Sequence, residues 1–430
     1  MILRPDGTLG AVLASESLGL TDTLVNGAGG CRSRTQIMLR DLMSTYKEED
    51  TRCCGSRFFS RQSRLPCTYI NGDDIVFGTG CKVSEGISSV SGITGKPTSV
   101  VETLGASLVC TDYAQISGNG VEVIPLDADL SSMSFEEGYD FATGRILSHL
   151  LPDDRERTSE PSVNLLGYGI HDLGWEFGLD NLKALLSNMG VKVLAAIGCM
   201  PSEDEVIAST GAWLNIMVHP ESCTETARMY ERNHDIPFLR PKDGAPVGYD
   251  SIRSMLKQVG EALGIDPTPA LCAVDSEASK VLGMLRNYNK GVNMLRGRMY
   301  SIEASSSELY PLMVWMHDVF AMVPDSIIPL DPEYLSEIAT YLESIGKADS
   351  LMSPRHGVDD IVFTDGVDCA YGKAEGGVTS YVEVRPPNMR GLNLVGRCTV
   401  GTGGCRYLID EMLNGINRFR CGQPSSIDMR

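Results

Sequence analysis

Short apolar runs alternate with amphipathic segments along most of the chain, a pattern typical of α/β domains with parallel sheets. The clearest unit begins with the apolar run 163–167, which predicts a buried strand. A Gly-rich loop and a helix with leucines at helical spacing, 181–188, follow it. The same unit predicts strands at 191–197, 214–218 and 236–239 and helices at 202–209 and through Arg228. This segment is expected to form a doubly wound open sheet.

A weaker version of this pattern continues towards the carboxyl end, and the first ~155 residues are also α/β but richer in Gly and Cys. After residue 269 the pattern predicts strands at 299–304, 326–330 and 360–364 and helices at 308–319, 334–345 and 404–419. Charged residues and Pro at 153–161 indicate a linker. We predict three Rossmann-like, doubly wound domains with mostly parallel sheets: 1–158 holding a metal cluster, 159–267, and 268–430 with the last helix packing back on it.

Composition narrows the class of protein. The 430 residues include 42% hydrophobic ones, enough for ordinary cores, and Lys+Arg minus Asp+Glu is 37 − 56 = −19. That balance argues against nucleic acid as the main partner, because phosphate binding needs clustered Lys and Arg. No apolar run approaches the ~18 residues of a membrane helix, and the first residues do not resemble a signal peptide. We expect a cytoplasmic protein without a membrane partner.

Thirteen cysteines are the first unusual feature. Their odd number and wide spacing argue against a disulfide framework, since cytosolic thiols stay reduced. Most are expected to be small buried residues, among the most buried of all types. The alternative is that a few of them ligate iron–sulfur or another soft metal.

The segment 23–34 is the best candidate for such a site. A short strand at 23–25 leads into a turn that contains Gly27, Gly29 and Gly30 and delivers Cys31 at the start of a helix. Glycines let a backbone approach a bulky group closely, and a helix N-terminus with nearby arginines favours the thiolate that a metal needs. The alternative is an ordinary turn with a buried Cys. Neither a P-loop nor a dinucleotide fingerprint occurs in this segment.

At this segment the chain resembles the nitrogenase component 1 family. Members have a strand, then His-Gly-x-x-Gly-Cys, then a helix, and residues 26–31 look like that motif with Asn26 in place of His. Looser similarities to the family follow in the same order at 73–78, 96–112, 214–237 and 383–411. The resemblance covers nearly the whole chain.

The departures from the family pattern are informative. Relatives that hold an eight-iron P-cluster supply three cysteines per subunit, but here the first position falls at Asp6 and the third at Leu104. Only Cys31 remains, as in the second chain of the cofactor-assembly scaffold. The resemblance therefore implies a 4Fe–4S cluster shared with a partner subunit, with Cys31 as one ligand. Asp6 is either a substitute ligand or, more simply, a helix cap.

Other cysteines are weaker candidates. Cys110 is expected to end a strand in the loop that faces a cluster in relatives, so it is a further possible ligand. Packing explains Cys67 and Cys81 more simply. Cys53 and Cys54 are adjacent, and vicinal cysteines do not easily point at one iron.

Two histidines are candidate catalytic residues. Catalytic relatives hold a large cofactor with one Cys and one His, and the resemblance places His219 at the Cys position and Arg385 near the His position. His171 lies in a loop after a strand and is a possible proton donor. The simpler reading is a hydrogen-bonded loop residue for His219 and a solvated one for His171.

The resemblance implies the β-type subunit of a nitrogenase-like reductase working anaerobically. An α-type partner would complete a heterotetramer, and a separate ATP-dependent 4Fe–4S reductase would deliver electrons, with ATP bound only there. The alternatives are a non-catalytic scaffold for cofactor assembly, a homodimer in which Cys31 and Cys110 of each chain complete one cluster, and a cluster-free α/β enzyme. The substrate stays open between a tetrapyrrole, a thioether and a cofactor precursor.

Overall fold

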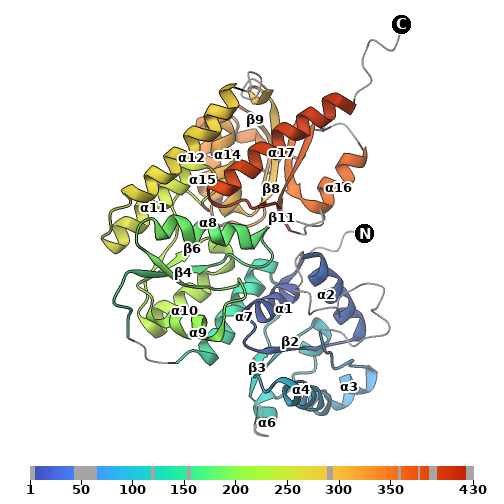
Figure 1. Ribbon diagram of the computed structural model, residues 1–430. Helices are drawn as coiled ribbons and strands as arrows, with labels where there is room; N and C mark the ends of the chain where they lie inside the picture. Colours follow the sequence, from blue (N-terminus) through green and yellow to red (C-terminus); the bar gives the residue numbers. More distant parts are fainter. Residues whose placement is uncertain are drawn as a thin grey trace. The chain divides into compact units, whose positions relative to one another are not determined.

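The chain is described by a computed structural model (Figure 1). It covers residues 5–42, 65–117, 122–152, 156–287, 294–356, 360–375, 378–386 and 395–422. Within these residues the chain forms three sheets, whose strands pair in parallel and are accompanied by helices. The predicted α/β fold with mostly parallel sheets is confirmed.

The first sheet has the strand order β1-β2-β3. Its strands are β1 (Asp22–Asn26), β2 (Thr98–Glu102) and β3 (Val123–Leu126). A parallel bridge from Val25 to Cys67 adds the following chain segment to the edge of β1 that does not face β2. Helices around this sheet are α1 (Gly7–Leu18), α2 (Gly29–Leu42), α3 (Gly72–Phe77), α4 (Gly80–Thr94), α5 (Leu104–Ser107), α6 (Tyr113–Ser117) and α7 (Phe135–Leu150).

The core of this part lies between the sheet and α4 and α6. Its buried members are Leu24, Val83, Ile87, Val100, Tyr113, Ile116 and Val123. β1 and β2 contain β-branched residues, and nearly all positions of both strands are buried, as expected for parallel strands covered on both faces.

The second sheet has the order β5-β4-β6-β7, in which β4 pairs with β6 in parallel. Its strands are β4 (Ser162–Leu166), β5 (Lys192–Ala196), β6 (Leu214–Met217) and β7 (Phe238–Leu239). The helices in this stretch of sequence are α8 (Trp175–Ser187), α9 (Glu203–Ala208), α10 (Thr224–His234) and α11 (Tyr249–Leu263), with short 3-10 turns at Ser209–Gly211 and Pro220–Ser222.

The third sheet has the order β11-β10-β8-β9. Its strands are β8 (Met299–Ala304), β9 (Val323–Pro329), β10 (Ile361–Asp365) and β11 (Ser380–Arg385). Its helices are α12 (Thr268–Asn287), α14 (Ser306–Phe320), α15 (Leu335–Ser344), α16 (Gly366–Glu375) and α17 (Gly401–Gly422), with a 3-10 turn at Ala348–Ser350. The last helix, α17, packs on β11 and on α8 and α11.

The sequence placed some elements incorrectly. Helix α8 begins at Trp175 rather than at residue 181, because Gly174 in a left-handed turn (φ 57°) starts it directly after the Gly-rich loop. β11 follows the expected last strand at 360–364, so the third sheet contains one strand more than predicted. For the segment 73–78 no element was predicted; most of it lies in the short helix α3 (Gly72–Phe77), which is capped by Asn71.

Contacts between residues group the chain into two compact units. The first consists of Met1–Ile170, Leu194–Met217 and Glu221–Phe238, and the second of His171–Val193, Val218–Pro220 and Leu239–Arg430. Each of the three sheets lies within one of the segments 1–158, 159–267 and 268–430. The division into three domains stays a prediction.

Candidate functional site

The Gly-rich loop follows β1, whose two edges pair with different later segments of the chain. From β1 the chain passes through α2 to the segment beside Val25 on one edge, and later to β2 on the other edge. Such a switch point opens a crevice beyond the carboxyl ends of the strands, where ligands bind in open α/β sheets. The Gly-rich loop, residues 27–30, follows directly on Asn26, the last residue of β1, and its last two residues, Gly29 and Gly30, already form the first turn of α2 together with Cys31.

Hydrogen bonds hold the start of this loop rigidly. The Gly27 N–H donates to Thr68 Oγ1 at 3.0 Å, and that hydroxyl donates to Asn26 Oδ1 at 2.9 Å. The Ile70 N–H donates to the Gly27 carbonyl at 3.0 Å, and the Thr103 N–H donates to the Asn26 carbonyl at 3.1 Å. The loop is therefore tied to the segments on both edges of β1.

The glycines of the loop serve different purposes. A Cβ on buried Gly27 would lie 2.4 Å from Thr103 Oγ1, so this position is closed to any side chain. A Cβ on Gly29 would come within 3.1 Å of the Tyr69 ring, whereas one on Gly30 would meet nothing within 4 Å. Gly27 is thus required by packing, and Gly30 leaves open space beside Cys31.

This difference gives a stability prediction. We expect Gly27→Ala to destabilise the fold by about 1–3 kcal/mol, because the added methyl overpacks against Thr103. Gly30→Ala is the matched control and should leave the thermal unfolding midpoint unchanged or slightly raised, since its methyl meets no atom and alanine favours the helix α2 more than glycine does. Equal midpoints for both variants would contradict this account of the loop.

Cys31 lies in the first turn of α2 and is partly exposed. The side chain of Cys67, also partly exposed, reaches the same loop, with Sγ 3.1 Å from the Gly27 carbonyl oxygen. The pKa of the Cys67 thiol is raised, mainly by burial and to a smaller extent by the negative charge of Cys31. A hydrogen bond from the Tyr69 N–H and the positive charge of Arg32 partly offset this increase. The structure therefore brings two thiols to one loop. The sequence assigned Cys67 to packing; its proximity follows from the bridge to Val25, for which no sequence motif gave a signal.

The other proposed ligand positions lie differently. Cys110 does not end a strand: β2 ends at Glu102, and Cys110 follows the short helix α5 with φ 51°, exposed, its Sγ donating to the Ser107 carbonyl at 3.7 Å. Asp6 caps α1 by accepting from the Leu9 N–H and pairs with Arg34 at 2.6 Å, as the cap interpretation predicted.

Four other residues named in the sequence analysis, Leu104, Cys53, Cys54 and Cys81, give no support to a metal site. Leu104, at the third P-cluster position, begins α5 with an exposed side chain. Cys53 and Cys54 lie outside the described residues. Cys81 is exposed on α4.

A buried carboxyl group lies behind the loop. Tyr113 OH donates to Glu102 Oε1 at 2.6 Å, and Asn26 Nδ2 donates to Tyr113 OH at 3.2 Å. Burial raises the pKa of Glu102, which the Tyr113 hydroxyl partly offsets. Asn26 occupies the family's His position and so connects this carboxyl group, through Thr68, to the Gly27 N–H.

The histidine candidates lie in the second compact unit. His219 Nδ1 is 2.9 Å from Ser307 Oγ, and its Nε2 is 3.8 Å from Asp172 Oδ1. Burial lowers the pKa of His219 to about 4 and that of His171 to about 3, the latter helped by His219. The solvated loop expected for His171 is wrong, because its side chain is buried. Both rings are neutral at pH 7, and a catalytic role for either stays a prediction.

Glu308, in the first turn of α14, is a titratable group that the sequence did not reveal. Burial raises its pKa to about 7, and a hydrogen bond from Thr399 partly offsets this. Between pH 4.5 and 7 the folded protein binds a proton at Glu308 that the unfolded chain has lost. The contribution of Glu308 to the free energy of unfolding is therefore greatest below pH 4.5 and is lost as the pH rises through 7.

This pH dependence predicts that Glu308→Gln raises the free energy of unfolding, and that the increase depends on pH. The neutral amide removes the need to ionise a buried carboxyl, so we expect stability to rise by roughly 3 kcal/mol at pH 8 and little at pH 4. Thermal unfolding between pH 4 and 8 measures this. Glu343→Gln, at an exposed position of α15, is the matched control. A gain that is independent of pH would contradict the prediction.

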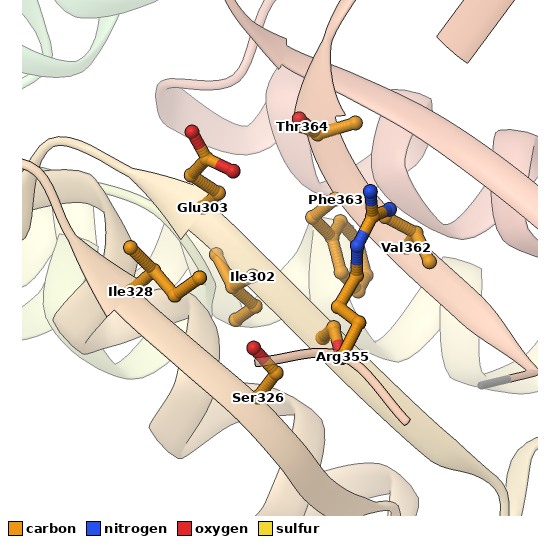
Figure 2. Close-up of a pocket in the computed structure, with 9 residues that line it drawn as sticks. Ile302, Glu303, Ser326, Ile328, Arg355, Val362, Phe363 and Thr364 are labelled. Atoms are coloured by element: carbon orange, nitrogen blue, oxygen red, sulfur yellow. The ribbon is translucent and has the colours of Figure 1, made fainter. Parts of the chain in front are cut away.

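Arg385, near the family's His position, is held by acidic groups. Its guanidinium pairs with Glu303 Oε1 at 2.7 Å and Asp365 Oδ2 at 3.0 Å, at the ends of β8 and β10. A pocket in the third sheet is lined by residues of β8, β9 and β10 and by Arg355 (Figure 2). Its volume of about 10 Å³ admits about one water molecule, too little for a substrate.

The described residues contain no group of three His, Cys, Asp or Glu side chains placed to hold a metal ion. No helix in the described part of the chain is long and apolar enough to cross a membrane.

Comparison with known proteins identifies the class of the chain. The pattern of the family "Nitrogenase component 1 type Oxidoreductase" matches residues 7–417, and the chain belongs to this family. The expected family is thereby confirmed.

Individual relatives are distant. A nitrogenase molybdenum-iron protein alpha chain of Methanosarcina barkeri is 24% identical over 204 residues, 45% of this chain and 37% of that one. One subunit of the light-independent protochlorophyllide reductase of Rhodopseudomonas palustris is 30% identical over 126 residues, 29% of this chain and 22% of that one. The chain thus spans less than half the length of these curated relatives. A solved structure of nitrogenase Cp1 at pH 6.5 shares the fold, with a TM-score of 0.78 and 14% identity over 100% of this chain and 96% of that one.

Proposed function

We propose that this chain is the β-type subunit of a nitrogenase-like two-component reductase and holds, through Cys31, a 4Fe–4S cluster at its contact with an α-type partner. The observation that carries the proposal is the placement of Cys31. It lies in the first turn of α2, directly after a Gly-rich loop at the switch point of the first sheet. Family membership supports the same chemistry.

The residues present fit an iron–sulfur cluster. Thiolates are the ligands that such clusters take, and Cys31 has a second thiol, Cys67, at the same loop. Gly30 leaves the space beside Cys31 open to a bulky group. When bound, the cluster would supply storage for single electrons.

Exposed apolar side chains near the loop support a partner subunit. They belong to the segments that bond to the loop or follow them: Tyr69, Ile75, Val76, Phe77, Leu104 and Leu108. Phe77 is 85% exposed and Leu108 is 78% exposed, values unusual for residues of this type. Ile75, Val76 and Phe77 are consecutive, and neighbouring exposed apolar side chains are typical of protein contacts; a partner over them would exclude water from the cluster.

The residues of this chain then have separate roles. Cys31 binds iron as a thiolate. Thr68 and Thr103 fix the loop by their hydrogen bonds to Gly27 and Asn26. Glu102 and Tyr113 form a hydrogen-bonded wall behind the loop. ATP would bind only to a separate 4Fe–4S reductase that delivers electrons one at a time.

Electron delivery distinguishes this function from cofactor assembly. The chain is produced anaerobically with the subunits encoded beside it and mixed with the ATP-dependent reductase. We expect ATP to cause reduction of the cluster, seen by EPR, and turnover of a small substrate by the complex. A cluster that is not reduced with ATP, and that instead leaves for an acceptor apoprotein, would refute the reductase and favour the scaffold.

A further inference from the structure

Cys67 lies on the opposite side of the Gly-rich loop from β2. Its parallel bridge to Val25 places it at the carboxyl end of β1, level with the residues that lead into the loop. The Val25 N–H donates to the Pro66 carbonyl at 2.9 Å, and the Thr68 N–H donates to the Val25 carbonyl at 3.1 Å. Backbone pairing on both sides of Cys67 therefore fixes its position against the loop.

The sulfur atom of Cys67 faces the loop itself. Sγ is 3.1 Å from the carbonyl oxygen of Gly27 and 4.0 Å from that of Ala28. It also accepts a hydrogen bond from the Tyr69 N–H at 3.4 Å. Backbone N–H groups directed at cysteine sulfur are a feature that tunes iron–sulfur clusters, so the surroundings of this sulfur suit a ligand.

Cys67 Sγ contacts the backbone of Gly27 and Ala28, and Cys31 follows three residues after Ala28 in the first turn of α2. The other described cysteines of the first 158 residues, Cys81 and Cys110, are exposed, and neither bonds to the Gly-rich loop. The Gly-rich loop thus has one thiol in contact with its first residues and another directly after its last residue, Gly30, where space is open.

We propose that Cys67 is a second thiolate that this chain gives to the cluster held by Cys31. The inference rests on the proposed function and deepens it. On binding iron, the Cys67 thiol releases its proton to solvent and exchanges its hydrogen bond to the Gly27 carbonyl for an Fe–S bond, with no change in oxidation state. The Tyr69 N–H keeps its bond to the sulfur. The partner subunit then supplies two of the four cluster ligands rather than three.

Substitution of Cys67 in the full chain, produced anaerobically with its partner subunits, tests this inference. Cys67→Ala should lower iron affinity by more than the ~10–100-fold that follows loss of an outer-shell group and should change the EPR line shape of the reduced cluster. Cys67→Ser, which keeps an oxygen ligand, should retain iron with a shifted reduction potential. Cys81→Ala is the matched control and should match the wild type.

The outcomes separate this inference from the proposed function. If Cys67→Ala keeps the wild-type iron content, EPR line shape and potential while Cys31→Ala loses them, Cys67 is no ligand and the proposed function stands. If the wild-type complex contains no iron, both fail. Circular dichroism of each variant checks its fold, and should Cys67→Ala not fold, an unshifted potential in Cys67→Ser overturns the inference.

Discussion

Replacing Cys31 by alanine is expected to abolish the iron–sulfur cluster of the complex. The thiol lies in the first turn of α2 beside the open space at Gly30, and no other thiol in the described residues follows the loop 27–30 directly. Iron and sulfide content of anaerobically purified complex should fall to near zero, and the EPR signal of the reduced protein should disappear.

Cys272→Ala is the matched control, because Cys272 is exposed on α12 and lies in the other compact unit. It should leave the iron content and the EPR signal unchanged. An iron content in Cys31→Ala equal to that of the wild type would refute Cys31 as a ligand. The search for ligands would then move to Cys67 and Cys110.

The buried histidines are expected to make the protein sensitive to acid. Their folded pKa values, about 3 for His171 and about 4 for His219, lie below the ordinary 6.5. Below pH 6.5 the unfolded chain therefore binds more protons, so stability falls with the pH until the folded pKa is passed. At pH 5 the loss is roughly 2 kcal/mol for each ring, about 4 kcal/mol together.

Thermal unfolding between pH 5 and 7.5 measures this loss. The variant with both His171→Gln and His219→Gln should lose much of its sensitivity to acid, whereas His149→Gln, at a half-exposed position of α7, should behave like the wild type. A double variant whose unfolding midpoint falls with pH as steeply as that of the wild type would contradict the burial of these rings.

The fold was largely predictable because parallel strands leave a clear signal. Apolar runs such as 163–167 and 299–304 are buried strands in both the sequence pattern and the structure. Helix starts were less predictable. The start of α8 depends on Gly174 in a left-handed conformation, and nothing in hydrophobic spacing reveals that backbone choice.

The candidate site was predictable where it is local in sequence. The Gly-rich loop and Cys31 are consecutive, and the family motif identified them. Cys67 reaches the loop through a strand pairing 42 positions from Val25, as 67 − 25 shows, and such contacts have no local pattern. The prediction that Cys110 ends a strand was wrong for a related reason. The short helix α5 separates Cys110 from β2, and so short a helix within an apolar run leaves no recognisable pattern in the sequence.

The sequence also did not predict that the side chains of His171 and Glu308 are buried. His171 lies in the loop after β4 and Glu308 in the first turn of α14, and hydrophilic residues in loops and at helix starts are usually solvated. Their burial comes from packing within the second unit, which depends on residues far apart in the chain. Only the structure reveals their shifted pKa values.

The measurement that tests the central claim most directly is iron analysis with Mössbauer spectroscopy of the wild-type complex, purified anaerobically with the subunits encoded beside it. The account predicts a 4Fe–4S cluster at each contact between this chain and its partner, which dithionite reduces by one electron. Two results would contradict a cluster shared through Cys31. One is a complex without iron, and the other is an isolated partner subunit that takes up the iron when it is loaded without this chain.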